Sequence, residues 1–161
     1  SGNLDLCIDV ADKTPNLEWV KLLEKPLSLA VPVSHALLRD KPKRRVVKVD
    51  ELEGERFLLF SRYEYPTAWE EMTQYFVNSG VNVKVAGEFD GIGSMSLALE
   101  AGLGIALVAS NISFSDKVRK LQLKPTPDPV CVSVGWSAHK ALSPVQAVFV
   151  EELRKQSERH R

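Results

Sequence analysis

The sequence is poor in the residues that staple small secreted folds and that build metal or nucleophilic sites. Its 161 residues include only two cysteines and three histidines. No C-x-x-C or H-x-x-x-H spacing and no dense acidic loop occurs, so neither a bound metal nor a cofactor is expected. Cys7 and Cys131 lie in apolar, strand-like runs, which is typical of reduced cysteines. We therefore expect a cytoplasmic protein in which both thiols are reduced and no disulfide forms.

Long apolar runs and an excess of charge of one sign are also missing. No run approaches the ~20 residues that would cross a bilayer, and the N-terminus has no signal-peptide pattern, so no membrane partner is expected. The 21 basic and 21 acidic residues cancel to a formal charge of zero. Because nucleic-acid-binding domains usually carry a basic face, this balance argues against a free-standing one.

Short apolar runs that alternate with amphipathic segments predict an α/β fold with a largely parallel sheet. With 44% hydrophobic residues, the chain can bury one core without disulfides or metal. The run at 104–109 is almost wholly apolar, which indicates a strand covered on both faces. Strands are expected at residues 4–10, 27–33, 56–61, 81–85, 104–109, 130–136 and, as a short edge strand, 118–123.

Three helices are expected between and after these strands. The first begins at Pro66, with Glu70 and Glu71 in its first turn and Gly80 just past its end. The second covers 93–101 and is closed by Gly102. The third opens at a capping box of Ser143 to Gln146 and frays after Leu153. Its expected buried stripe consists of Val145, Val148, Phe149 and Leu153.

Catalytic residues are not indicated. There is no G-x-S-x-G elbow, and neither cysteine adjoins a histidine that could act as its base. The pairs Gly91/Gly93 and Gly102/Gly104 each resemble half of a dinucleotide fingerprint, but Ser96 stands where the third glycine should be. We therefore expect no enzyme activity and treat these glycines as turn residues.

Two strand-to-helix turns remain as candidates for a ligand site. Residues 61–67 join one strand to a helix, and residues 90–94 join another. Small ligands bind at the carboxyl ends of strands in open α/β sheets, and helix N-termini attract anions. Arg62 has no evident apolar or capping role there, which favours a binding role, whereas Ser61 and Thr67 could simply cap the turn.

Five segments in order resemble the effector-binding domain of LysR-type transcriptional regulators. They are GNLDLCI at 2–8, LSLAVPVSHAL at 27–37, GERFLLF at 54–60, ALEAGLGIALVAS at 98–110 and the closing strand into Trp136. The resemblance covers nearly the whole chain.

The resemblance implies a type II periplasmic-binding-protein-like fold, in which two α/β lobes are joined by two crossover strands and hold a small effector between them. It implies that residues 1–24 and 130–161 form part of the first lobe and that 25–129 form the second. It further implies that these residues supply only part of the first lobe, without the family's winged helix-turn-helix, and that Cys7 and Cys131 lie close together on neighbouring strands of that lobe. The residues that it and the turns assign to ligand binding are Asp9, Val10, Ser61, Arg62, Pro66, Thr67, Ile92, Gly93 and Ser133.

The sequence is thus interpreted as an effector-sensing regulatory domain that binds a small, anionic metabolite and couples it to DNA binding by a separate module. The alternative is a solute-binding protein of the same fold that serves a transporter; a two-lobed enzyme is a weaker third. Because the first lobe would leave an unpaired sheet edge, a homodimer or higher homo-oligomer is expected.

Overall fold

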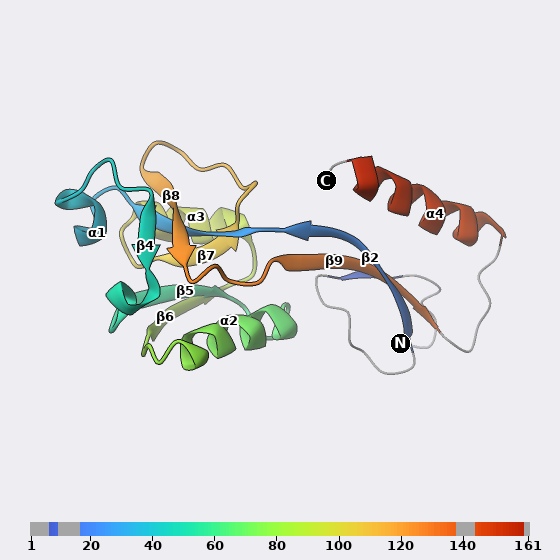
Figure 1. The fold of residues 1–161 in the computed structure, drawn as a ribbon, viewed down its shortest axis with the longest axis horizontal. Helices are drawn as coiled ribbons and strands as arrows, with labels where there is room; N and C mark the ends of the chain where they lie inside the picture. The colour runs from blue at the N-terminus through green and yellow to red at the C-terminus, as the bar shows by residue number, and fades with distance from the viewer. Residues whose placement is uncertain (1–6, 10–16, 138–143, 160–161) are drawn as a thin grey trace. The chain divides into compact units, whose positions relative to one another are not determined.

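The computed structural model describes residues 7–9, 17–137 and 144–159. The chain divides into two compact units (Figure 1). Unit 1 combines Ser1–Lys25 with Pro129–Arg161, and unit 2 is the continuous segment Pro26–Asp128. Two predicted positions, Val10 and the helix-capping Ser143, lie outside the described residues.

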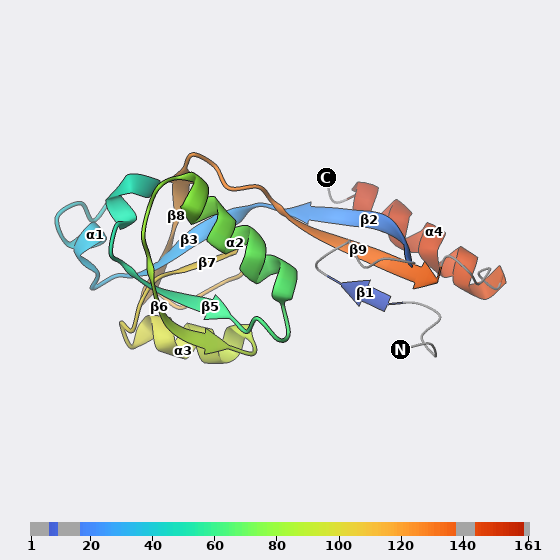
Figure 2. The same cartoon turned by 90° about the horizontal axis from the view of Figure 1, so that it is seen from below.

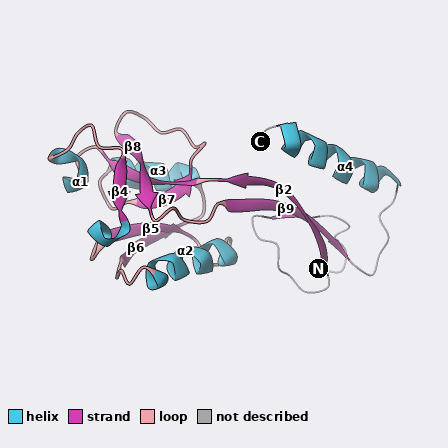
Figure 3. Ribbon diagram, in the orientation of Figure 1, coloured by secondary structure: helices cyan, strands magenta, loops and turns pink. Residues whose placement is uncertain are grey.

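Unit 2 alternates strands with helices (Figure 3). Its elements are β3 (Leu27–Pro32), α1 (Ala36–Arg39), β4 (Val46–Lys48), the 3₁₀ helix η1 (Val49–Leu52), β5 (Arg56–Phe60), α2 (Pro66–Asn78), β6 (Lys84–Phe89), α3 (Ile92–Glu100), β7 (Ala106–Ala109) and β8 (Val118–Lys124). The α/β class is as expected. The strand expected at 81–85 is displaced: β6 begins at Lys84, whereas Val81 and Val83 precede it and pack against the core.

The sheet of unit 2 is mixed, so the expectation of a largely parallel sheet is wrong. β3 is antiparallel to both of its neighbours, β7 and β8, while β4 pairs parallel with β8 and β5 pairs parallel with β6. The chain enters the unit along β3 and leaves it along β8, so these adjacent strands must run in opposite directions. β8 was expected as an edge strand, but it lies inside the sheet between β3 and β4.

Strands β3, β5 and β7 of unit 2 are buried on both faces, because their alternate side chains enter two separate apolar clusters. On β7, Ile105 just before the strand and Leu107 enter the first cluster, whereas Ala106 and Val108 enter the second. The first cluster packs against α2 and the second against α3, and Figure 2 shows these helices on opposite sides of β5 and β6. The prediction that 104–109 is covered on both faces is confirmed.

Helices α2 and α3 begin and end close to the predicted residues. Pro66 is the first residue of α2, and Gly80 follows its end with a φ of 69°. Gly102 follows α3 with a φ of 74°, in the left-handed conformation that glycine adopts at little cost. One detail is wrong: the first turn of α2 holds no acidic residue, because Glu70 and Glu71 fall in the second.

The described residues of unit 1 form one antiparallel sheet and one helix. The sheet consists of β1 (Cys7–Asp9), β9 (Val130–Ser137) and β2 (Leu17–Lys25), with β9 in the centre. β2 was not predicted. Helix α4 (Pro144–Arg159) does not fray after Leu153, and it lies against β2. Its expected buried stripe is wrong as well: Val145, Val148 and Phe149 are exposed, and Val150 is buried.

The two cysteines are not neighbours, although their strands are. Cys7 on β1 pairs with Gly135 of β9, and Cys131 pairs with Glu24 of β2. On β9, Cys131 and Gly135 are four positions apart, which corresponds to roughly 13 Å at the usual rise of a strand. That separation is too long for a disulfide, and Cys131 is a free thiol, as expected.

Gly104 lets β5 approach β7. A Cβ at this position would lie 2.6 Å from the carbonyl oxygen of Arg56 and 3.2 Å from the side chain of Leu58. Backbone hydrogen bonds hold this contact: Ile105 N–H donates to Arg56 O at 2.9 Å, and Leu58 N–H donates to Ile105 O at 2.8 Å. The isolated bridge between Phe57 and Ile105 thereby joins the β5–β6 pair to the larger sheet.

We expect Gly104→Ala to destabilise the protein by about 2 kcal/mol, because the added methyl group collides with backbone that cannot move without breaking this bridge. Gly93→Ala is the matched control, since a Cβ at Gly93 meets no atom within 4 Å. It should leave stability unchanged or raise it by up to ~1 kcal/mol. Urea unfolding of both variants measures the difference, and equal midpoints would contradict the role given to Gly104.

Glu51 lies in η1 and bonds to Arg44 in the loop before β4. Its carboxylate accepts hydrogen bonds from Arg44 Nη2 and, at 2.8 Å, from the Lys48 backbone N–H. The bond from Arg44 is the main cause that lowers the pKa of Glu51; desolvation opposes it, and the Lys48 N–H adds to it. The pair is partly exposed, so its contribution to stability is modest.

The pH dependence of this contribution has a definite sign. Because the folded-state pKa of Glu51 is lowered, the stabilisation is present above the unfolded value of 4.5 and is lost as pH falls through the folded value. Glu51→Gln should therefore be less stable than the wild type at neutral pH, and the difference should shrink below pH 4.5. Asp50→Asn, at a carboxylate that bonds to no described residue, is the control. A Glu51→Gln deficit that stays constant down to acid pH would refute this account.

Candidate functional site

The two predicted turns lie together at one end of the β5–β6 pair. Because these strands are parallel and adjacent, the chain leaves both of them at the same edge of the sheet. Ser61 N–H donates to the carbonyl oxygen of Phe89 at 2.9 Å and so ties the first turn to the second. The structure thus brings together six of the predicted residues, namely Ser61, Arg62, Pro66, Thr67, Ile92 and Gly93.

Ser61 is buried and shapes the first turn. Its side chain accepts a hydrogen bond from the Tyr63 backbone N–H at 3.2 Å, and its carbonyl accepts one from Tyr65 N–H at 2.8 Å. The capping role considered for Ser61 is therefore real. Thr67 differs, because no described residue bonds to its hydroxyl, which lies half-buried in the first turn of α2.

Neither helix at these turns has a side-chain cap. Tyr65 stands at the N-cap position of α2, and its side chain accepts no hydrogen bond from the N–H groups of the first turn. The N-cap residue of α3 is Gly91, which has no side chain that could do so. The first N–H groups of a helix have no partner within the helix and carry the positive end of its dipole. Two such ends at one edge of the sheet suit a negatively charged or strongly polar ligand group.

Arg62 has partners that the sequence did not reveal. Its Nε donates to Glu88 Oε1 at 3.3 Å, and its guanidinium carbon lies 4.9 Å from the centre of the Trp69 ring. The reasoning that Arg62 has no apolar contact is therefore wrong. The Arg62 side chain is still 60% exposed, so Glu88 and Trp69 hold it at the surface of the turn without enclosing it.

The charge around the turns is mixed. Glu64, Glu88 and Asp90 are exposed there beside the single cation Arg62. Any preference for an anion must therefore come from the two helix N-termini and from Arg62 once it is released from Glu88.

Two predicted residues of unit 1 share one row of its sheet. Asp9 of β1 pairs with Ser133 of β9, and Ser133 pairs on its other side with Lys21 of β2. Lys21 was not predicted, because β2 itself was not. Only Leu17, Glu18 and Trp19 alternate between apolar and charged, which is too short a pattern to predict the strand.

The described residues show no alternative metal or membrane function. They contain no group of three or more histidine, cysteine or acidic side chains placed to hold a metal ion. None of the helices among them is long and apolar enough to cross a membrane.

In unit 2, two helix N-termini without side-chain caps follow adjacent parallel strands at one sheet edge, which is where small ligands bind in α/β folds. A family model, the LysR substrate binding domain, matches residues 1–158. The chain therefore belongs to the LysR substrate-binding domain family, as its motifs indicated, and it is an effector-binding domain of the LysR type with the periplasmic-binding-protein-like fold. No curated protein sequence matches it significantly.

Solved structures of this family have the same fold. The regulatory domain of Synechocystis PCC6803 CcmR in complex with 2-PG aligns with a TM-score of 0.80 and 20% identity, over 97% of this chain and 74% of that one. The effector-binding domain of QuiR in complex with shikimate gives 0.77 and 15%, over 99% and 74%. HinK, a LysR family transcriptional regulator from Pseudomonas aeruginosa, gives 0.77 and 18%, over 97% of this chain but 53% of its own.

Proposed function

We propose that this chain is the effector-sensing part of a LysR-type transcriptional regulator and that it binds a small anionic metabolite. The observation that carries the proposal is the pair of uncapped helix N-termini at the joined turns of unit 2, in a chain of this family. Shikimate, which QuiR holds, is a carboxylate, and a carboxylate suits such a site.

In this proposal Thr67 and the N–H groups of α2 and α3 hold the anion, and Arg62 exchanges its bond to Glu88 for one to the ligand. Asp9, Val10 and Ser133 are proposed as ligand contacts of the first lobe. A site in the cleft between the lobes stays a prediction from the resemblance. Binding would alter DNA binding by a separate helix-turn-helix module in the cytoplasm, with no chemical conversion of the ligand.

A thermal-shift screen of carboxylates, sulfur compounds and amino acids, each beside its uncharged analogue, tests the proposal directly. We expect at least one anionic compound to raise the melting temperature while its neutral analogue does not. Stabilisation by neutral compounds alone would overturn the anionic part of the proposal, and no stabilisation by any member of a broad panel would count against the effector role.

Charge variants at the turn sharpen the test. Arg62→Ala should weaken binding of an anionic hit by roughly tenfold to a hundredfold, because a charge-assisted hydrogen bond is worth about 1.5–3 kcal/mol. Glu88→Gln should strengthen binding, since it frees Arg62 for the ligand. Arg56→Ala, an exposed arginine at the opposite end of β5, should change nothing. Calorimetry in which Arg62→Ala binds the anion as tightly as the wild type would remove Arg62 from the site.

We also expect the chain to form a dimer or larger species at micromolar concentration. The exposed side chains of Val145, Val148 and Phe149 have the i, i+3, i+4 spacing of one helix face on α4, and such apolar faces recruit partners. Val148→Glu should then shift light scattering toward the monomer mass of 17.9 kDa. Val77→Glu, at an equally exposed valine of α2, is the control. A wild-type chain that is monomeric throughout would contradict this expectation.

A further inference from the structure

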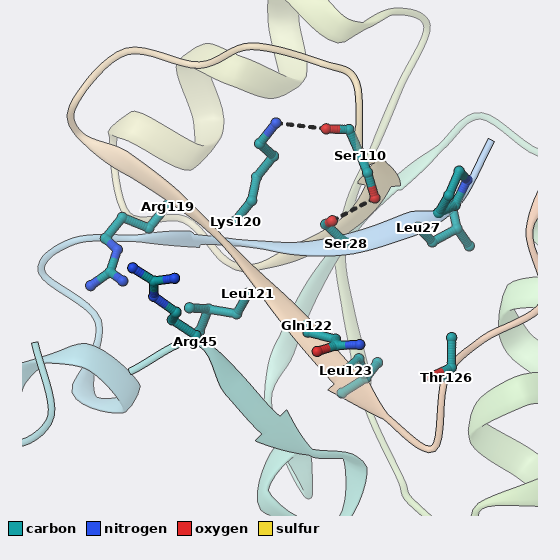
Figure 4. A pocket seen from close by; sticks show the side chains of 11 residues that line it. Leu27, Ser28, Arg45, Ser110, Arg119, Lys120, Leu121, Gln122, Leu123 and Thr126 are labelled. Atoms are coloured by element: carbon teal, nitrogen blue, oxygen red, sulfur yellow. Dashed lines mark hydrogen bonds between the residues drawn. The ribbon is translucent and has the colours of Figure 1, made fainter. Parts of the chain in front are cut away.

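A pocket of about 590 Å³ lies in unit 2, away from the turns that hold the candidate effector site. Strands β3 and β8 and the segment before β4 form it, whereas the candidate turns follow β5 and β6. Its volume is in the range of small-ligand sites. None of the 11 residues that line it is acidic, and three of them are basic (Figure 4).

Lys120 brings a positive charge that no carboxylate of a described residue neutralises. Its ammonium group donates to two backbone carbonyl oxygens, to Ser110 at 2.7 Å and to Ile112 at 2.8 Å. These bonds fix the position of the ammonium group and use two of its three hydrogens. The full charge and the third donor remain available at the pocket.

Arg119 and Arg45 add two more such charges. The Arg119 guanidinium donates to the backbone carbonyls of Pro42 and Arg44, the latter at 2.8 Å. The Arg45 side chain is exposed and bonds to no described residue, and Figure 4 shows both guanidinium groups at one end of the pocket. The nearby carboxylate of Glu51 is committed to Arg44 and lines no part of the pocket. Two guanidinium groups this close repel one another unless an anion lies between them, and the Lys120 ammonium group adds a third positive charge at the Ser110 end.

Neutral donors complete the lining. The hydroxyls of Ser28 and Ser110 lie 2.6 Å apart, so one of them donates to the other and the second keeps its hydrogen for a ligand. Gln122 is exposed on β8, and its backbone N–H donates to Arg45 O at 2.8 Å, which holds β8 and the basic segment together. The pocket therefore offers fixed hydrogen-bond donors beside three uncompensated cations.

We propose that this pocket binds a small anion with at least two negative charges, of the kind found in phosphate esters and polycarboxylates. The site is independent of the effector turns, and it would make unit 2 sensitive to a second class of metabolite. A concave site with neutral donors suits a small anion better than duplex DNA, whose phosphates follow an extended surface.

Inorganic pyrophosphate is the probe, titrated into the whole chain by calorimetry, with orthophosphate for comparison. We expect saturable binding of pyrophosphate that is tighter than that of orthophosphate and weakens as salt rises. Arg45→Gln should weaken it by about fivefold or more. Gln122→Glu, which places a carboxylate in the pocket without changing the shape of the side chain, should weaken it by about tenfold or more.

Each variant has a matched control with the same chemical change elsewhere in unit 2. Arg56→Gln and Gln74→Glu are exposed and do not line the pocket, so they should bind pyrophosphate as the wild type does. Thr67→Val, at the effector turn, should also bind pyrophosphate as the wild type does. If the effector-site proposal is wrong, pyrophosphate binding at the pocket is therefore unaffected, and the two proposals are tested separately. Circular dichroism of every variant verifies the fold.

Three results would overturn the proposal. Pyrophosphate that shows no saturable binding leaves the pocket without a ligand of this class. Equal losses in Arg45→Gln and Arg56→Gln would mean that overall charge, and not the pocket, attracts the anion. Duplex DNA that binds through Arg45 and Gln122 and displaces pyrophosphate at physiological salt would assign this surface to nucleic acid.

Discussion

The contact between Gly104 and the carbonyl of Arg56 joins the two sheets of unit 2, and the candidate effector site depends on it. Without a side chain at Gly104, the backbone of β7 comes within hydrogen-bond distance of β5. β5 is thereby fixed between β7 and β6, and its side chains enter both apolar clusters. The turns after β5 and β6 are loops, but each directly follows a strand whose position this bridge fixes, β5 through Ile105 and β6 through its pairing with β5. A ligand site on such turns is preorganised by the sheet beneath it.

Unit 2 separates its charges although the chain as a whole is neutral. Glu64, Glu88 and Asp90 lie at the effector turns, whereas Arg45, Arg119 and Lys120 line the separate pocket. The zero net charge correctly argued against a generally basic protein, but it carried no information about local fields. Composition averages over the surface, while binding depends on charges within about a Debye length of ~8 Å. The basic pocket could not be found from the sequence, because its residues come from four separate segments.

The elements that the sequence predicted well are those whose local signal agrees with their surroundings. Pro66 and Gly102 mark helix ends through backbone preference alone, and both positions are confirmed. β2 was missed because a bulge between Lys21 and Leu23 breaks the two-residue alternation of its side chains. In β6 only Val85 of the predicted valines is paired, with Phe57, whereas Val81 and Val83 precede the strand and pack against the core.

Tertiary contacts explain the remaining differences. The spacing of apolar residues in α4 identified an apolar face, but this spacing does not show which face packs against the rest of the unit. In the structure Val150 is buried, whereas the predicted Val145, Val148 and Phe149 are exposed. At the site, sequence order placed Ser61 and Arg62 at the right turn. The partners of Arg62 lie at positions 69 and 88, on α2 and β6, and only the fold brings them to it. Roles that depend on partners distant in sequence are the ones that local patterns do not predict.

Helix α2 connects the effector turn to the segment through which the chain leaves unit 2. It begins at Pro66, and nine residues later, or about 13.5 Å along the axis, the Tyr75 hydroxyl donates to the carbonyl of Pro125 at 2.7 Å. Burial raises the pKa of Tyr75, so this hydroxyl stays protonated and keeps its donor role. Phe76 packs α2 into the first cluster and anchors the C-terminal half of the helix. A displacement of α2 by a ligand at its N-terminus must therefore carry the Pro125 segment with it or break the Tyr75 bond, and either outcome changes how the chain leaves the unit.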